Sequence, residues 1–513
     1  MTTAIETFFD DLIKEWGSDR VTRDPSVWAP LLTNTLGVHR TLTGVVYPES
    51  AEDVCQVVKM ARQHKVPLYP ISCGQNVGYG QRLPVRDGSV LVDLGRMNKI
   101  KEFDSIQGSV VVEPGVTQGQ LYQFLEDQKA KFWLDATGAG LRASIIGNSL
   151  EGGFGHTPKG DHRRFWTDVA LVLGNGQVLK TGTFPGLGPD LAGLFVQSNF
   201  GIITSARVEL MPKPERFVSF IVSVKGDEQL GSLVDAMRQL RQAGHLQSLV
   251  HIANALRSLM TCLPFPGTYK NSLIKNEDAK RLMSVPFLPV GLWTAAGGIY
   301  GNQAQVRAAK MAIRKQVAGF GRVNFFSDLT LSLLLHLSAA PLIKITRFGK
   351  RANESLKAFQ PIHQLMQGVP SPEAMDNIGW RHAEPDKMGL LWCAPTISSE
   401  GNKAREAIQL AEKIFYEHGF EMPATLTLVR PERLVCVLSI HFDKSDPAER
   451  ERAHTLYHTL NHRFAEMGIY PYRTSILTME KMQYEGGKQE VLAALKKIFD
   501  PDGLISPGRY GMG

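Results

Sequence analysis

The stretch PLYPISCGQNVGYG, residues 67–80, decides how the first part of this chain folds. A strand is expected at its start, and a loop with Gly74, Gly78 and Gly80 follows directly. Glycine has no Cβ atom, so the backbone amides of such a loop approach a ligand closely enough to cradle a pyrophosphate. The spacing differs from the dinucleotide motif GxGxxG, and a glycine-rich loop taken alone is more often a plain turn. The neighbouring segments therefore decide its meaning.

On both sides of this loop, the pattern predicts a mixed α/β region that runs from Thr43 to about Pro214. Short runs of β-branched residues alternate there with helical segments and glycine-rich turns. One helix is expected to begin after Ser50, a residue type that caps helices. From Glu215 onward, amphipathic helical patterns alternate with strands such as RLVCVLSIHF, residues 433–442, which indicates a second domain. The turn-rich tail is expected to pack back on the rest of the chain.

The bulk composition is that of a soluble globular protein without a nucleic-acid partner. The chain has 513 residues, of which 43% are hydrophobic and 21% charged, and its net charge of +7 is spread along the sequence. The five cysteines lie far apart without a CxxC spacing, so reduced thiols and no metal site are expected. The N-terminal segment lacks the features of a signal peptide, which favours a cytoplasmic location. The longest apolar stretch, residues 329–345, is too short to span a membrane and is expected to form a buried helix.

Further motifs accompany the loop in a fixed order along the chain. They are VVVEPGVT (110–117), GNSLEGGFGHTPKGDH (147–162), LVLGNGQVLKTG (171–182), QSNFGIIT (197–204), NIGWRHAEPDKMGLLWCAP (377–395), YPYRTS (470–475) and DPDGLISPGRYG (500–511). With these motifs the chain resembles the 4-alkylphenol-oxidising branch of the vanillyl alcohol oxidase and p-cresol methylhydroxylase family of FAD-linked oxidoreductases. The resemblance extends over most of the chain.

The resemblance implies an α+β fold in three parts. Residues 1–213 would form a FAD-binding domain of the p-cresol methylhydroxylase type. Residues 214–465 would form a cap domain, itself α+β and built on an antiparallel sheet. Residues 466–513 would return to the FAD-binding domain. A homodimer or a higher homo-oligomer is also implied.

For the first domain, the resemblance implies a FAD site. The matching positions are Ser72, Gly74, Gln75, Asn76, Gly78, Tyr79, Pro114, Ser144, Gly147, Asn148, Gly153, Gly201 and Ile202. The positions that link FAD covalently in relatives hold Leu390 and Ile378 here, and Gln75 replaces the histidine used in another branch of the superfamily. Non-covalent FAD is therefore expected, with His382 left as an alternative attachment point.

The resemblance also implies a site that holds a phenol as its phenolate. Tyr79, Tyr472 and Arg473 match the two tyrosines and the arginine that bind the phenol in relatives; without the family, the last two would be taken for a surface pair in a strand. A guanidinium and two phenolic donors lower the pKa of a bound phenol and stabilise its anion. Arg509 matches a basic residue near the flavin. His156 stands where relatives carry an active-site tyrosine, and it is a candidate catalytic base.

Two differences from the family bear on the reaction. The aspartate that acts as a base in vanillyl alcohol oxidase is replaced by Thr137 or Gly138. Leu426 and Ser439 stand near positions where p-cresol methylhydroxylase has acidic residues. The sequence therefore leaves open which residue acts as the base and which substrate is bound.

The predicted function is FAD-dependent oxidation of a small para-substituted phenol, either a 4-alkylphenol or a 4-hydroxybenzylic alcohol. A hydride would pass from the benzylic carbon to flavin N5 and leave a quinone methide. The electron acceptor is O2, a cytochrome or a quinone, and the sequence does not choose between them. Two alternatives stay open: a FAD-dependent D-2-hydroxy-acid dehydrogenase on the same fold, and a flavin-binding protein whose catalysis has decayed.

Overall fold

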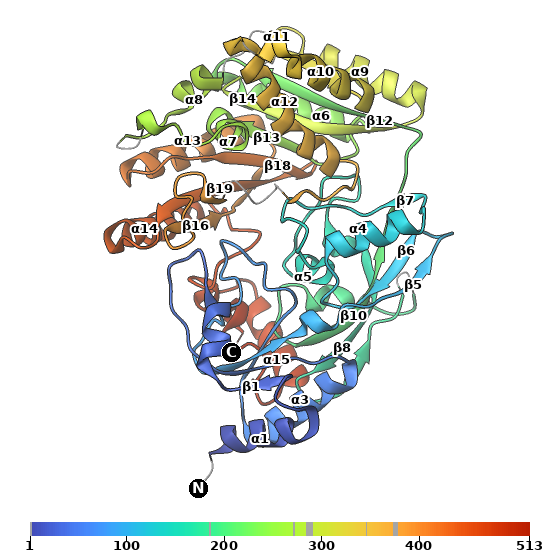
Figure 1. The fold of residues 1–513 in the computed structure, drawn as a ribbon, viewed down its shortest axis with the longest axis vertical. Coiled ribbons are helices and arrows are strands. Elements are labelled where there is room, and N and C mark those ends of the chain that lie inside the picture. The colour runs from blue at the N-terminus through green and yellow to red at the C-terminus, as the bar shows by residue number, and fades with distance from the viewer. Residues whose placement is uncertain are drawn as a thin grey trace.

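The computed structural model describes residues 3–183, 186–269, 272–283, 291–344, 346–372 and 378–512. It has two units stacked along its longest axis (Figure 1). The lower unit in that view contains the N-terminal helices, two sheets and the C-terminal helix. The upper unit contains one large sheet with helices packed on it. Helices are combined with largely antiparallel sheets, so the predicted α+β class is confirmed.

The smaller sheet of the lower unit carries the glycine-rich loop. Its strands lie in the order β1, β2, β4, β3, and the pairs β2–β4 and β4–β3 are parallel. Strand β3 ends at Ile71, so the loop leaves the sheet at the carboxyl end of a parallel strand, where open α/β sheets bind their ligands. The strand bounds are β1 Val21–Thr22, β2 Leu42–Val46, β3 Leu68–Ile71 and β4 Ser89–Asp93.

A five-stranded antiparallel sheet completes the lower unit, in the order β5, β6, β10, β8, β9. Helix α3 packs on β8 and β10. It begins after Ser50 as predicted, because the Ser50 hydroxyl accepts a hydrogen bond from the backbone N of Asp53 at 3.1 Å. The bounds are α1 Ala4–Trp16, α2 Pro25–Trp28, α3 Ala51–His64, β5 Ile100–Asp104, β6 Ser109–Val112, α4 Gln118–Asp127, α5 Ile145–Leu150, β8 Trp166–Leu173, β9 Val178–Lys180 and β10 Gly201–Glu209; the short β7 (Phe132–Trp133) and β11 (Met211–Pro212) pair with each other.

One antiparallel sheet forms the centre of the upper unit. Its strands lie in the order β15, β12, β14, β13, β18, β19, β16, and β17 also pairs with β19. The strand bounds are β12 Arg216–Val224, β13 Val250–Asn254, β14 Trp293–Gly301, β15 Gly321–Phe326, β16 Met388–Cys393, β17 Thr396–Ser398, β18 Ala424–Arg430 and β19 Arg433–Asp443. The helices are α6 Leu230–Gln242, α7 Ala255–Cys262, α8 Asn276–Met283, α9 Gln303–Val317, α10 Asp328–Ala339, α11 Pro341–Lys344, α12 Arg347–Leu365, α13 Gly401–Glu417 and α14 Pro447–Glu466.

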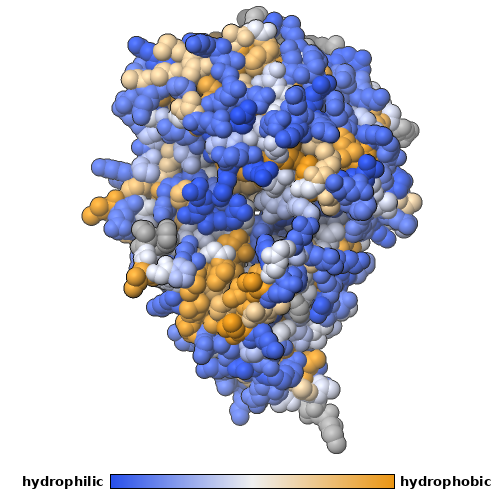
Figure 2. Space-filling model, turned by 180° about the vertical axis from the view of Figure 1, so that it is seen from behind, coloured by the Kyte–Doolittle hydropathy of each residue, from blue (hydrophilic) through white to orange (hydrophobic). Residues whose placement is uncertain are grey.

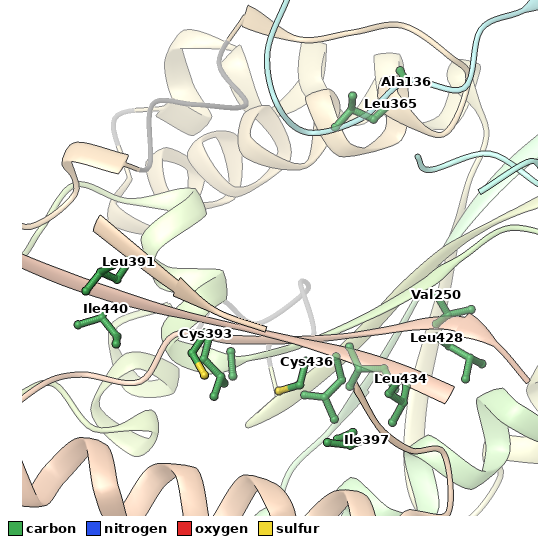
Figure 3. Packing of buried hydrophobic residues seen from close by; sticks show 14 of the residues in the cluster. Ala136, Val250, Leu365, Leu391, Cys393, Ile397, Leu428, Leu434, Cys436 and Ile440 are labelled. Atoms are coloured by element: carbon green, nitrogen blue, oxygen red, sulfur yellow. The ribbon is translucent and has the colours of Figure 1, made fainter. Parts of the chain in front are cut away.

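The two faces of this sheet have different surroundings, because side chains alternate along each strand. Cys436 belongs to the large apolar cluster on one face (Figure 3), and its strand partner Leu426 is fully buried beside it. Ser439 lies three residues further along β19 and therefore on the opposite face. The register of β13, β18 and β19 puts His251 on the same face as Ser439. This second face is turned toward the lower unit, since the ring of His251 stacks on His156 with 4.5 Å between centroids.

The C-terminal segment lies in the lower unit, where α15 (Lys488–Phe499) is drawn in red beside the N-terminal strands (Figure 1). The backbone N of Leu68 in β3 donates to the carbonyl of Leu504 at 2.8 Å, and the backbone N of Ser506 donates to the carbonyl of Leu68 at 2.7 Å. The C-terminal segment thus pairs with β3, the strand from which the glycine-rich loop departs. The domain boundaries at residues 213 and 465 stay predictions.

The apolar stretch expected to form a buried helix is exposed on one side. Most of it forms α10 and α11, and Ile345 lies outside the described residues; in α10, Leu331 is buried while the side chains of Leu329, Leu333 and Leu337 are 81%, 57% and 51% exposed. A segment that is apolar all round does not reveal which side the rest of the chain covers. Apolar side chains gather in separate patches on both units (Figure 2). Within the described ranges, no helix combines the length and apolarity needed to cross a membrane.

A buried ion pair ties α15 to the lower unit. The Lys496 ammonium, 7% exposed, donates to the Asp500 carboxylate at 2.7 Å and to the carbonyls of Asn199 and Ile505 at 2.8 and 2.9 Å. The cation therefore links the last helix to the loop before β10 and to the segment that follows the helix.

Lys496→Met should destabilise the protein, because it leaves Asp500 buried without its cation. We expect a loss of about 3–5 kcal/mol in the free energy of unfolding, measured by urea denaturation. Lys497→Met, one residue along on an exposed position, is the matched control and should change stability by less than about 0.5 kcal/mol. Equal effects of the two substitutions would contradict the anchoring role.

Candidate active site

An elongated pocket with an empty volume of about 1120 Å³, open mouth included, runs through the lower unit. Its walls come from the glycine-rich loop, from α5, from the start of β10 and from the C-terminal segment. Of the positions predicted to bind FAD, those on its lining are Ser72, Gly74, Gln75, Asn76, Pro114, Ser144, Gly147, Asn148, Gly201 and Ile202. Their role in binding FAD stays a prediction.

Close backbone packing shapes this pocket. Gly74 has φ of +65°, a conformation that L side chains rarely adopt, and a Cβ at Gly147 would lie 2.3 Å from the Ser72 hydroxyl oxygen. The Ser144 hydroxyl caps α5 by accepting from the backbone N of Gly147 at 2.9 Å, and it donates to the carbonyl of Pro114 at 2.7 Å. These contacts hold the glycine-rich loop, α5 and the segment at Pro114 together around the pocket.

Three of the predicted FAD positions do not line the pocket. A Cβ at Gly78 would lie 2.1 Å from Cδ1 of Trp392, so this glycine admits an indole of the upper unit. A Cβ at Gly153 would lie 2.0 Å from Oδ1 of Asn148. Tyr79 is buried behind Gly78 and only 5% exposed. At Gly78 and Gly153, the need for glycine comes from protein packing.

The structure brings Tyr79, Tyr472 and Arg473 together at one end of the pocket. The Arg473 guanidinium lies over the Tyr79 ring, 4.4 Å from its centroid, and it donates a hydrogen bond to the side-chain oxygen of Asn76 in the pocket wall. Burial raises the pKa of Tyr79 well above its ordinary value, and the neighbouring Tyr472 adds to this shift while Arg473 opposes it. Tyr79 therefore stays a neutral hydroxyl donor at physiological pH.

Tyr472 and Arg473 lie in a bend and not in the strand expected without the family. The preceding Pro471 forms an isolated bridge with Pro395, and the backbone N of Tyr472 donates to the carbonyl of Ala394 at 3.1 Å. These contacts fix the bend against the end of β16. A YPYRTS sequence has the aromatic content of a strand, but the proline removes a ladder donor.

Glu151 is a site residue that the sequence did not single out. Its carboxylate is buried, with Oε2 3.4 Å from Nε of Arg473, and its other oxygen forms an ion pair with Nη2 of Arg509. The Tyr510 hydroxyl donates to the same carboxylate at 2.5 Å. Arg509 also donates to the Tyr69 hydroxyl at 3.2 Å. The only hint in the sequence is an acid placed among the glycines of GNSLEGGFG.

His156 lies at the boundary between the units and not on the pocket lining. Its Nδ1 is 3.1 Å from the carbonyl oxygen of Ala136, so Nδ1–H donates there and Nε2 keeps the lone pair that a base needs. Burial lowers the pKa of His156, and burial together with the nearby His156 holds the pKa of His251 well below its ordinary value. A Cβ at Gly138 would lie 3.7 Å from Cε1 of His156, so the imidazole borders the position that lacks the family's aspartate.

The positions considered for covalent FAD attachment lie away from the pocket lining. The carbonyl of Ile378 is 3.2 Å from Nδ1 of His441, and Leu390 is fully buried. His382, the alternative attachment point, has Nε2 3.8 Å from the carboxylate of Glu449 on α14. Non-covalent attachment stays a prediction.

Gly74→Ala should lower FAD occupancy, because its Cβ would sit 2.5 Å from the Arg82 side chain in the loop that lines the pocket. Gly88→Ala is the matched control: it has φ of +81° and open space around it outside the pocket. Both variants should lose about 1–2 kcal/mol of stability from the left-handed backbone. Only Gly74→Ala should lose flavin absorbance per mole of protein after dialysis, and equal flavin content in both would contradict the assignment.

Comparisons with known proteins agree with this geometry. A family model described as FAD binding domain matches residues 42–182. The chain is 29% identical over 520 residues to 1'-carboxy-chondrochloren decarboxylase of Chondromyces crocatus, covering 96% of this chain and 95% of that protein. It is 29% identical over 491 residues to the 4-cresol dehydrogenase [hydroxylating] flavoprotein subunit of Pseudomonas putida, covering 92% and 88%.

A solved structure of p-cresol methylhydroxylase with substrate bound superposes with a TM-score of 0.87 at 26% identity, covering 99% of this chain and 97% of that one. The predicted FAD-binding domain type and cap architecture are therefore confirmed at the level of the fold. The resemblance to the vanillyl alcohol oxidase and p-cresol methylhydroxylase family is therefore confirmed, and the chain is a FAD-dependent oxidoreductase of the 4-cresol dehydrogenase type.

Proposed function

We propose that this enzyme oxidises a para-substituted phenol at the carbon attached to the ring. The observation that carries the proposal is the cluster of Tyr79, Tyr472 and Arg473 at the end of the pocket. Two phenolic hydroxyls beside a guanidinium form a binding site for the oxygen of a phenolate. The 4-cresol dehydrogenase relative, by its name, acts on such a phenol.

Charge counting supports the same proposal. Arg473 and Arg509 bring two positive charges to this end of the pocket, and Glu151 brings one negative charge, so one positive charge is left in excess. A bound phenol ionises more readily beside an excess cation in a buried site, because the opposite charge favours its anionic form. Neutral Tyr79 contributes a hydrogen-bond donor to that anion.

The phenolate then assists the departure of hydride from the benzylic carbon, since its electron pair moves through the ring to form a quinone methide. FAD, when bound, supplies the acceptor for that hydride. Arg473 and Tyr79 hold the phenol oxygen, which fixes the para carbon relative to the pocket. His156 is the proposed base for a benzylic alcohol or for water, because Nδ1 donates to Ala136, which leaves the lone pair on Nε2, and because the ring lies next to Gly138.

The chain would hold FAD without a covalent bond. Leu390 and Ile378 have no nucleophilic atom, and the His382 imidazole is beside Glu449. The electron acceptor and the homodimer or higher homo-oligomer remain predictions from the resemblance, and the cytoplasmic location remains a prediction from the N-terminal segment. The alternatives are a D-2-hydroxy-acid dehydrogenase and a flavin-binding protein whose catalysis has decayed.

Anaerobic mixing with 4-alkylphenols and 4-hydroxybenzyl alcohols should bleach the flavin absorbance. Arg473→Met should slow this reduction about 10²- to 10³-fold, the usual loss when one donor to a developing anion is removed, and Tyr472→Phe should slow it as well. Arg433→Met, at an exposed position of β19, should reduce at the wild-type rate. Bleaching only by D-2-hydroxy acids would favour the first alternative, and no bleaching by any of these substrates would favour the second.

Acid precipitation tests the attachment of the flavin. We expect the yellow colour in the supernatant and a colourless pellet, because Leu390 and Ile378 have no nucleophilic atom and His382 is not on the pocket lining. His382→Ala should leave this result unchanged. A yellow pellet from the wild type that becomes colourless in His382→Ala would show covalent attachment through that histidine.

A further inference from the structure

The upper unit contains a largely buried arginine that forms no ion pair with any described residue. Arg257 lies in the first turn of α7, and its Nη1 is buried with no hydrogen-bond partner among the described residues. Its one ring contact is with Trp392, whose ring centroid lies 5.5 Å from the guanidinium carbon. Burial lowers the pKa of Arg257 to about 10, which still leaves it charged at neutral pH. A buried charge without a counter-ion is costly, so it indicates a missing anion.

Two further polar groups next to Arg257 also lack partners. Ser439 is fully buried, and its hydroxyl makes no hydrogen bond within the described part of the chain. His441 is 6% exposed, and its Nε2 is likewise without a partner there. Ser439 is paired with Trp392 across β19 and β16, so the two side chains share the face turned toward the lower unit. His441 follows two residues later on the same face.

His441 does not compete with Arg257 as a cation. Its Nδ1 is 3.2 Å from the carbonyl oxygen of Ile378, so Nδ1–H donates there and the ring stays neutral. Burial, with the charge of Arg257 as the next cause, lowers the pKa of His441 to about 3. The lone pair at Nε2 is thus an acceptor, suited to a hydroxyl group or a water molecule.

The two described acids near His441 and Arg257 each lie beside another basic side chain. Glu421 pairs with Arg381 at 2.6 Å, and Glu449 lies 3.8 Å from His382. Neither acid forms an ion pair with Arg257. Among the described residues, neither Glu421 nor Glu449 therefore offsets the charge of Arg257.

This polar group adjoins the phenol end of the site through Trp392. The indole fills the space that Gly78 leaves open, and Gly78 directly precedes Tyr79 in the chain. Trp392 consequently contacts the segment that carries the phenol-binding tyrosine on one side and the Arg257 guanidinium on the other. A substrate anchored at Tyr79 would extend its para substituent along the indole toward Arg257.

We propose that Arg257 and Ser439 bind a carboxylate on the para substituent of the substrate, with His441 accepting a hydrogen bond beside it. The inference rests on the proposed function, because the phenol end orients the substrate. A carboxylate matches the planar fork of a guanidinium with two oxygens, and its second lone pairs suit the Ser439 hydroxyl. The preferred substrate is then a 4-hydroxyphenyl alkanoic acid, with one anionic group at each end once the phenol ionises.

The experiment compares 3-(4-hydroxyphenyl)propanoate and 4-(4-hydroxyphenyl)butanoate with their methyl esters, which keep the shape and remove the charge. Anaerobic flavin reduction is followed over a range of concentrations to obtain the apparent Kd and the limiting rate. For the wild type we expect at least one acid to bind on the order of 10- to 100-fold more tightly than its ester. Equal affinity for acids and esters would overturn the inference while leaving phenol oxidation intact.

Variants test which residue causes the preference for the acid over its methyl ester. Arg257→Met should abolish the preference for the acid with little change for the ester, Arg257→Lys should restore part of it, and Ser439→Ala should weaken it. Arg405→Met, a partly exposed arginine on α13, is the control and should keep the wild-type preference. A merely structural Arg257 would instead affect acid and ester equally. If neither acids, esters nor 4-alkylphenols bleach the flavin, the proposed function itself fails.

Discussion

The carboxylate of Glu151, buried between the guanidinium groups of Arg473 and Arg509, is the electrostatic constraint on which the active site depends. Two buried arginines that face the same pocket repel each other in a low-dielectric interior. One shared carboxylate allows them to stay close and still leaves one positive charge. The three residues come from the end of α5, the bend after α14 and the last turn of the chain. The return of the C-terminal segment is therefore a condition for the site as well as for stability.

The same constraint explains why the pocket is built from closely packed backbone. Glu151 follows α5 directly, and α5 is held against the glycine-rich loop because Gly147 leaves room for Ser72. The loop carries Asn76, which accepts a hydrogen bond from Arg473. A shift of the loop would thus move Arg473, and a shift of Arg473 would remove one of the two cations beside the Glu151 carboxylate. The glycine-rich loop and the charged end of the pocket are therefore held in place by the same contacts.

The sequence predicts those features that depend on local patterns. The loop at residues 72–80 and the helix cap at Ser50 follow from glycine spacing and helix signals, whereas the α+β class follows from the family resemblance. The ion pairs of Glu151 join positions more than 300 residues apart in sequence, so no local pattern contains them. No local pattern predicts the stacking of His156 on His251 either, since the two rings come from different units. The sequence also does not reveal which side of α10 is covered: its leucines lie on several sides of the helix, and only the fold decides that Leu329 faces solvent.

Glycines show a further limit of sequence reasoning. Gly74 and Gly78 look equivalent in ISCGQNVGYG, because both allow a close approach. In the structure Gly74 lines the pocket, whereas Gly78 receives the Trp392 indole. That difference matters for specificity, because Trp392 is how the upper sheet reaches the substrate end of the lower unit. In the proposed function, the lower unit holds the phenol oxygen and the flavin, and residues of the upper unit contact the para substituent. With the proposed substrate, Ser439 on β19 and Arg257 on α7 would meet a carboxylate, whereas a neutral methyl group would leave the charge of Arg257 without a counter-ion.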